Sequence, residues 1–186
     1  MNAVAGVFSG LHGALLLARG RAEGVRYVSD DMRMAARSFW AALICSPLFI
    51  VVLLLSWKVD GQPGNPPHAF VLQLLSFAIG WAGYAVLSHP LVAAFRRAPH
   101  WPRFIAIWNW CNVVQYGLLL IASIPAVLGA PSWLAETAQL VAQGWALWLE
   151  WFAIRLTLDV GGLTAAIVMA PDVLLGVVLA TLVTGA

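Results

Sequence analysis

The sequence predicts an all-α integral membrane protein, a helical bundle of five transmembrane helices with an N-terminal amphipathic interfacial helix. Of the 186 residues, 62% are hydrophobic and only 10% are charged, whereas roughly a quarter of the residues of a soluble domain are charged. Several apolar stretches are each long enough to cross a bilayer, which takes about 20 residues. The ten tryptophans fit the same class, because indole rings favour the headgroup region.

The chain is expected to form a single membrane domain over residues 1–186, with an interfacial N-terminal segment at 1–28 and a five-span bundle at 29–186. The connections between the apolar stretches are short, so we expect consecutive helices to be antiparallel neighbours. The spans are placed at Phe39–Trp57, Ala69–Phe95, Arg103–Gly129, Trp133–Thr157 and Leu163–Thr184.

The N-terminal segment Met1–Ala18 repeats apolar residues at helical spacing, with small and polar residues between them. This pattern indicates either an amphipathic helix lying on the membrane surface or a helix packed against the bundle. The segment has no basic n-region and no clean cleavage site, so a secretory signal peptide is not expected. Ser29 is predicted to cap the helix that leads into the first span, with Asp30 and Asp31 in its first turn.

The basic residues predict the orientation in the membrane. Lys58 is the only basic residue expected on the opposite side from the arginines. Because loops rich in Lys and Arg stay in the cytoplasm, the N-terminus should be cytoplasmic and the C-terminus should lie on the far side. The arginines before the first span, between the second and third, and at the junction of the fourth and fifth are Arg19, Arg21, Arg26, Arg33, Arg37, Arg96, Arg97, Arg103 and Arg155.

Polar residues and prolines inside the spans fall at similar depths, in the half of the membrane nearer the arginines. Asp172 directly follows Pro171 in the otherwise apolar string "MAPDVLL". Polar side chains in a bilayer normally face the bundle interior or a watery cavity. No arginine lies at the depth of Asp172, so we expect its carboxyl to be neutral or to share a proton. The predicted intramembrane polar layer consists of Asp172, Glu150, Asn109, Asn112 and His89.

Two main interpretations of this layer are open. In the first it is a closed structural network, in which Asn109 or Asn112 donates a hydrogen bond to Asp172 or Glu150 and the prolines kink the helices. In the second it is a polar cavity open to the cytoplasm that binds a proton, an ion or a small polar ligand, as the broken helices of transporters do. Docking of a protein partner or a lipid headgroup at the same place is a further alternative.

A second polar stripe runs along the fourth span. Glu136, Gln139, Gln143 and Glu150 are separated by intervals that bring them to one face of a helix. Alanines run beside this stripe, and small residues let another helix approach closely.

Several classes of function are disfavoured. A net charge of +2 is too small to indicate a nucleic-acid partner. Cys45 and Cys111 lie in apolar segments without a CxxC pair, which is typical of small buried hydrophobes. The histidines lack ligand spacing, so no metal site is expected, and no cofactor or catalytic motif is present. We therefore expect a protein without enzymatic activity.

Local strings in the spans resemble a known group of proteins. The strings "RSFWAALICSP", "IGWAGY", "HPL", "RFIAIWNWCNVVQ" and "WLEWF" are similar to those of small bacterial inner-membrane proteins of Yip1-like type, over Ser38–Ala186. The resemblance implies five spans in the inner membrane, a cytoplasmic N-terminus, a periplasmic C-terminus and no enzymatic activity.

The function expected from the sequence is therefore that of a non-enzymatic scaffold or accessory subunit of the inner membrane. It would act through the lipid bilayer and through a protein partner or a second copy of the chain. The alternative is a small oligomeric transporter or channel that uses the intramembrane polar layer.

Overall fold

In the computed structural model, which describes residues 3–184, every regular element is a helix, as the all-α class predicts. A short N-terminal part precedes five long helices. Its elements are α1 (Ala3–Ala18), the 3₁₀ helix η1 (Ala22–Tyr27) and α2 (Met32–Ser38). The long helices are α3 (Trp40–Asp60), α4 (Pro66–Ala94), α5 (Trp101–Val127), α6 (Ser132–Leu158) and α7 (Gly162–Thr184), and the 3₁₀ turn η2 (Ala98–His100) joins α4 to α5.

All five apolar stretches are helices, but only four of them are long and apolar enough to cross a membrane. These four cover Met32–Asp60, Pro66–Ala94, Ala98–Val127 and Gly162–Val183. The exception is α6, which has 27 residues and is long enough. Its polar stripe of Glu and Gln side chains lowers its mean hydropathy, so composition alone does not mark it as a span.

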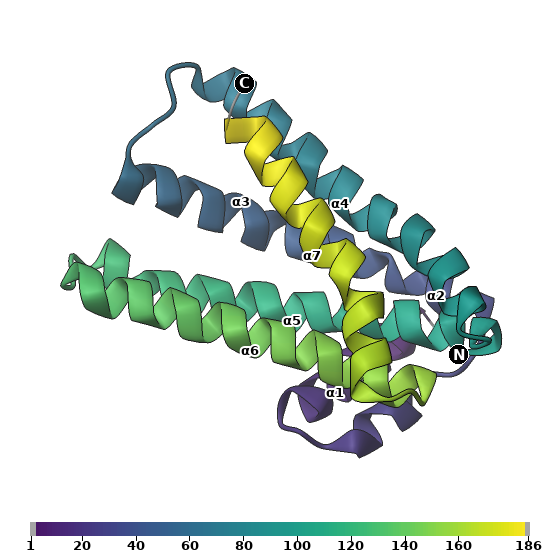
Figure 1. The fold of residues 1–186 in the computed structure, drawn as a ribbon. Helices are drawn as coiled ribbons and strands as arrows, with labels where there is room; N and C mark the ends of the chain where they lie inside the picture. The colour runs from purple at the N-terminus through teal and green to yellow at the C-terminus, as the bar shows by residue number, and fades with distance from the viewer. Residues whose placement is uncertain (1–2, 185–186) are drawn as a thin grey trace.

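The long helices form two arms that diverge from the end where α1 and α2 lie (Figure 1). One arm pairs α4 with α7, and the other packs α3 and α6 against α5. The expectation that consecutive helices are neighbours therefore holds for α5 and α6 but is wrong for α3 and α4. A glycine of α4 allows a close contact with α7: a Cβ at Gly83 would lie 2.9 Å from Leu175 Cδ2, whereas a Cβ at Gly80 would be in ordinary contact with Leu179 at 3.6 Å.

The hydrophobic core occupies the end of the molecule where the arms meet. Tyr84, Phe104, Leu149 and Val168, from four different helices, are fully buried there. Farther along the arms, large apolar side chains are exposed on the outer faces of the helices, which suits a lipid environment. Examples are Leu54, Leu75 and Val177.

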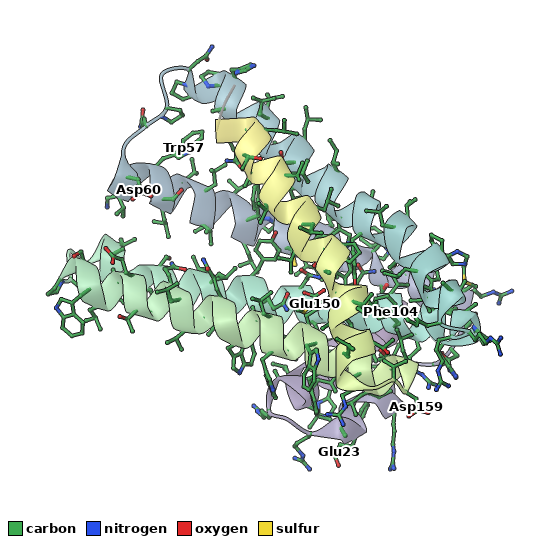
Figure 2. All side chains as sticks on the ribbon, viewed as in Figure 1. Glu23, Trp57, Asp60, Phe104, Glu150 and Asp159 are labelled. Atoms are coloured by element: carbon green, nitrogen blue, oxygen red, sulfur yellow. The ribbon has the colours of Figure 1, made fainter. Side chains whose placement is uncertain are left out.

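The arginines gather at the same end as the core. Arg103 Nη2 lies 2.9 Å from Asp30 Oδ2, and its Nε donates to the carbonyl of Val28 at 3.0 Å. Arg97 Nη2 donates to the carbonyl of Asp159 at 2.7 Å, at the corner between α6 and α7. Figure 2 shows Asp159 at this end and Asp60 at the opposite end of α3. The charge asymmetry read from the sequence is therefore an asymmetry between the two ends of the fold.

The N-terminal helix α1 packs against the bundle, which favours a packed helix over an amphipathic helix that lies on the membrane surface. Ala14 and Leu17 of α1 are fully buried in the core. The predicted cap at Ser29 is wrong, because α2 begins later: Asp31 is its N-cap and accepts a hydrogen bond from the backbone N–H of Arg33 at 3.0 Å. Asp30 is free of this task and pairs with Arg103.

Gly13 of α1 lies against Gly24 of η1, and we expect the substitution Gly13→Ala to destabilise the fold. A Cβ at Gly13 would lie 2.7 Å from the Gly24 carbonyl oxygen. Since that neighbour is backbone, η1 would have to move away, at a cost of about 1–3 kcal/mol. Thermal unfolding of the detergent-solubilised protein measures the loss.

Gly144→Ala on α6 is the matched control, because a Cβ there meets nothing within 4 Å. It should leave stability unchanged or raise it by about 0.5–1 kcal/mol, since Ala favours a helix over Gly. Equal stability of the two variants would contradict the close packing of α1 on η1.

Candidate functional site

Two carboxyl groups from different helices meet inside the bundle. Glu150 of α6 is 6% exposed, and its side chain is within hydrogen-bonding distance of Asp172 of α7. Figure 2 shows Glu150 near the point where the two arms join. The sequence placed both residues in one polar layer, and the structure brings this pair into contact.

The corner between α6 and α7 explains why these residues meet. Asp159 ends α6 in the left-handed conformation, with φ of 50°, and the chain turns back into α7. Glu150 lies eight residues before the last residue of α6, about 12 Å along the axis. Asp172 lies ten residues after the first residue of α7, about 15 Å along it. The two carboxyls therefore reach nearly the same height above the corner.

The environment of the pair offers few hydrogen-bond donors. The indole of Trp108 lies beside both carboxyls. The hydroxyl of Tyr84 is nearby but donates to the carbonyl of Val168 at 3.1 Å instead. The adjacent carbonyl, that of Ile167, is the one that Pro171 leaves without its helical N–H. Oε1 of Glu150 is buried and has no hydrogen-bond partner among the described residues.

A shared proton accounts for this arrangement. An ionised carboxylate only accepts hydrogen bonds, so two carboxyls can bond to each other only when one of them carries a proton. Leaving two negative charges side by side in an apolar interior would be costly. We therefore infer that Glu150 and Asp172 hold one proton between them.

Asp172 also lines a cavity of about 310 Å³ between α3, α4, α5 and α7. Aromatic rings form much of its wall: the Phe49 and Phe77 centroids are 4.9 Å apart, and the rings of Trp81 and Tyr116 are stacked. The complete lining is Phe49, Gln73, Ser76, Phe77, Gly80, Trp81, Trp108, Asn112, Tyr116, Asp172, Gly176, Leu179 and Ala180.

The cavity extends away from the arginine end, whereas the polar-cavity interpretation of the sequence placed its opening toward the arginines. From Asp172 its lining continues along α7 to Leu179 and along α4 to Gln73, both nearer the opposite end. Toward the arginines, the fully buried side chains of Tyr84, Phe104 and Val168 fill the space. The core of the bundle therefore separates the cavity from the end that we expected to be open.

The asparagines do not bond to the carboxyls, which corrects the closed-network interpretation. Asn109 is fully buried and belongs to a separate chain of hydrogen bonds: Trp81 Nε1 donates to its Oδ1 at 2.6 Å, and its Nδ2 donates to Ser38 Oγ at 2.6 Å. Asn112 donates to the carbonyl of Trp108 in its own helix at 3.0 Å. Asn109 thus ties α2, α4 and α5 together, and Asn112 forms part of the cavity wall.

His89 does not belong to the polar layer, although the sequence placed it there. Its side chain is exposed, and its ring lies 5.0 Å from that of Trp101. The preceding residue, Ser88, is the one that faces inward, where it accepts a hydrogen bond from Trp101 Nε1 at 3.1 Å. The position of His89 along α4 does not specify the face of the helix on which its side chain lies.

The backbone carbonyl that Pro47 leaves unpaired finds its partner within the same helix. Pro47 leaves the carbonyl of Leu43 without its helical N–H. The hydroxyl of the neighbouring Ser46 donates to that carbonyl at 2.9 Å. This partner comes from the same helix, so the asparagines are not required for it.

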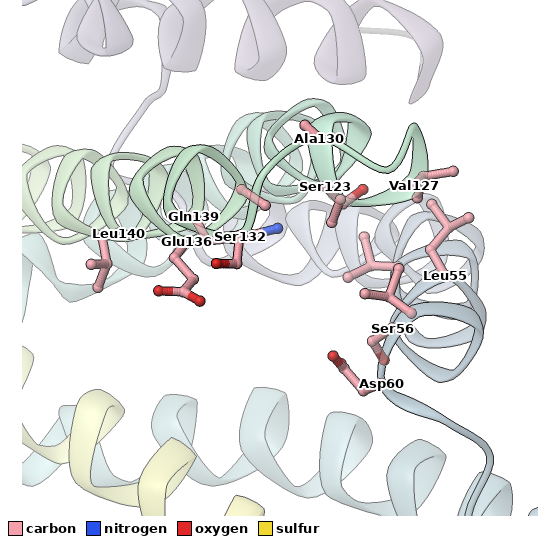
Figure 3. Close-up of a pocket in the computed structure, with 14 residues that line it drawn as sticks. Leu55, Ser56, Asp60, Ser123, Val127, Ala130, Ser132, Glu136, Gln139 and Leu140 are labelled. Atoms are coloured by element: carbon pink, nitrogen blue, oxygen red, sulfur yellow. The ribbon is translucent and has the colours of Figure 1, made fainter.

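Part of the second polar stripe lines a larger cavity of about 780 Å³ between α3, α5 and α6. Figure 3 shows Glu136 and Asp60 projecting into this space from α6 and α3, with Gln139 beside Glu136. Gln143 is exposed and does not line it. The stripe therefore divides: its beginning faces this cavity, and Glu150 at its end meets Asp172.

Aromatic residues of the site were missed in the sequence. Trp108, Asn112 and Tyr116 follow one another at intervals of four residues in "WNWCNVVQY", which places them on one face of a helix. The structure puts all three in the wall of the smaller cavity. The spacing of Trp108 and Tyr116, each four residues from Asn112, was therefore a signal in the sequence that predicted two rings on the same face as Asn112.

Comparison with known proteins identifies no relative, because no family model, curated protein or solved structure matches this chain. Among the described residues there is also no group of three or more His, Cys, Asp or Glu side chains that could hold a metal ion. The function has to be argued from the site itself.

Proposed function

We propose that the chain is a five-span protein of the bacterial inner membrane, with α3 to α7 as its crossing helices. The N-terminus lies in the cytoplasm and the C-terminus in the periplasm. Four of these helices are apolar enough by composition. The fifth crossing, by α6, is supported by connectivity: α5 and α7 both begin at the arginine end, so α6 must return from the opposite end between them.

A reporter fusion tests this orientation. Alkaline phosphatase, which is active only outside the cytoplasm, should be active when fused after Ala186, a position outside the described residues. The same enzyme fused after Ala94, at the arginine end of α4, should be inactive. An inactive C-terminal fusion together with an active one after Ala94 would reverse the proposed topology.

Within this frame, the site best supports a small transporter or channel that takes up and releases a proton at the Glu150–Asp172 pair. The observation that carries the proposal is the contact of these two carboxyls at the wall of a cavity. The pair lies about 12–15 Å from the arginine end, near the middle of a hydrocarbon layer about 30 Å thick. Ionisable residues at such depth in membrane proteins mark ion or proton pathways.

Proton flux into proteoliposomes tests this function. Vesicles that contain the wild-type protein and an internal pH-sensitive dye should acidify several-fold faster than empty vesicles when a proton gradient is imposed. Glu136→Gln is the matched control, since Glu136 is an exposed acid that lines the other cavity, and it should retain the flux. Wild-type flux no faster than that of empty vesicles would end the transport proposal.

The larger cavity favours a second candidate, the scaffold or accessory subunit. At about 780 Å³ it is lined by Val52, Leu55 and Val59 of α3 together with Leu140 of α6. An apolar helix from a partner or from a second copy of the chain would cover these side chains. Co-purification of a protein in a fixed ratio from gentle detergent extracts would support this candidate, and repeated isolation of a bare monomer would count against it.

A further inference from the structure

We propose that the cavity beside Asp172 binds a small organic cation with an apolar body, such as a quaternary or protonated amine, in exchange for the proton of the carboxyl pair. The inference rests on the proposed transport function and names its substrate class. On binding, the cation takes a place beside Asp172, and the proton held by Asp172 and Glu150 leaves to water, so the charge in the site is unchanged.

The rings of the wall provide the chemistry for an organic cation. Cations are attracted to the faces of Trp, Tyr and Phe rings, and cages of such rings recognise quaternary ammonium groups. Phe77 is central to this wall, with its ring centroid 5.3 Å from that of Trp81 and 6.0 Å from that of Tyr116. The cavity therefore offers aromatic surface on several sides rather than a single ring.

The charges around the cavity favour a cation over an anion. Among the described residues that line the cavity, Asp172 is the only Asp, Glu, Lys, Arg or His. From α3 the lining residue is Phe49. The polar lining residues of α4 and α5 are neutral apart from the weakly acidic Tyr116. Glu150 of α6 contacts Asp172 but does not line the cavity. No basic residue among these would therefore balance an anion, whereas the carboxyl pair carries one negative charge with its shared proton and two without it, and so attracts a cation.

The volume of the cavity fits a small molecule, and its oxygen atoms are too few for a hard divalent metal ion. A volume of about 310 Å³ lies at the lower end of the range for small-molecule sites, roughly 300–1,000 Å³. Hard metal ions such as Mg²⁺ and Ca²⁺ need about six or more oxygen ligands. The wall provides oxygen mainly from Asp172, Asn112, Gln73 and Ser76, and the rest is aromatic or apolar.

Equilibrium binding to the full chain in lipid nanodiscs tests the inference, with radiolabelled benzyltrimethylammonium as the probe in a weakly buffered solution. Wild-type protein should bind the probe saturably and release about one proton per bound cation. Asp172→Asn should abolish the proton release and weaken binding at least tenfold. Tyr116→Leu, which removes a ring, should weaken binding roughly threefold to thirtyfold, and Tyr116→Phe, which keeps it, should bind like the wild type.

The outcomes separate this inference from the transport proposal. No saturable binding by a wild-type protein that does conduct protons would overturn the cation site and leave the proton function standing. Saturable binding with proton release by a protein that shows no proton flux, even with benzyltrimethylammonium on the opposite side of the vesicle membrane, would uphold the site and end the transport function. Saturable binding without proton release would contradict the exchange, and binding unchanged in both Asp172→Asn and Tyr116→Leu would mean that the probe only partitions into lipid; either result would overturn the inference.

Discussion

Asp172→Asn is expected to reduce proton flux in proteoliposomes at least tenfold and to leave the fold intact. Asn has the shape of Asp and can still bond to Glu150, but it cannot release a proton. Glu150 is buried and does not line the cavity, so it reaches the cavity through Asp172. Without an acid at position 172, the carboxyl of Glu150 can no longer exchange a proton with the cavity.

Thermal unfolding of the same preparations shows whether the loss of flux is chemical or structural. The unfolding temperature of Asp172→Asn should match that of the wild type within a few degrees, because a neutral amide replaces an acid that shares a proton. Glu136→Gln should match the wild type in both flux and stability. Wild-type flux in Asp172→Asn would remove the carboxyl pair from the pathway.

Asn109→Ala is expected to be the most destabilising of the substitutions considered, by about 2–4 kcal/mol. It removes the acceptor for Trp81 Nε1 and the donor to Ser38 Oγ, both at 2.6 Å, and it leaves a cavity at a fully buried position. The indole N–H of Trp81 then has no partner in the interior. Unfolding in a denaturing detergent, followed by tryptophan fluorescence, measures the change.

Asn112→Ala, one helical turn away, is the matched control. Its side chain bonds only to a carbonyl of its own helix, so its loss should cost less than about 1 kcal/mol. Similar losses for the two variants would contradict the role of Asn109 as the link between α2, α4 and α5.

The sequence predicted what depends on local composition. Runs of apolar residues between short connections placed the five long helices, because a helix that meets lipid must be apolar over about 20 residues. The arginines marked one end of the bundle for a similar local reason. Depth counted along each helix placed Glu150 and Asp172 in one layer, since both were counted from the same corner, but it did not single out this pair.

The sequence did not predict which helices pair with each other or which face of each helix is buried. The pairing of α4 with α7 includes the close contact of Leu175 with Gly83, which are far apart in the chain. The exposure of His89 depends on where η2 places Trp101. The direction in which the cavity extends depends on Phe104 and Tyr84 filling the arginine end. Each of these is a tertiary contact that spacing along one helix does not specify.

The central claim is that Glu150 and Asp172 share a proton inside the bundle. Infrared spectroscopy of the protein in lipid measures it directly, because a protonated carboxyl absorbs in a region free of other protein bands. At neutral pH the wild-type protein should show this band, it should shift on exchange into deuterium oxide, and the double variant Glu150→Gln/Asp172→Asn should lack it. The absence of the band from the wild type, or its persistence in the double variant, would contradict the shared proton.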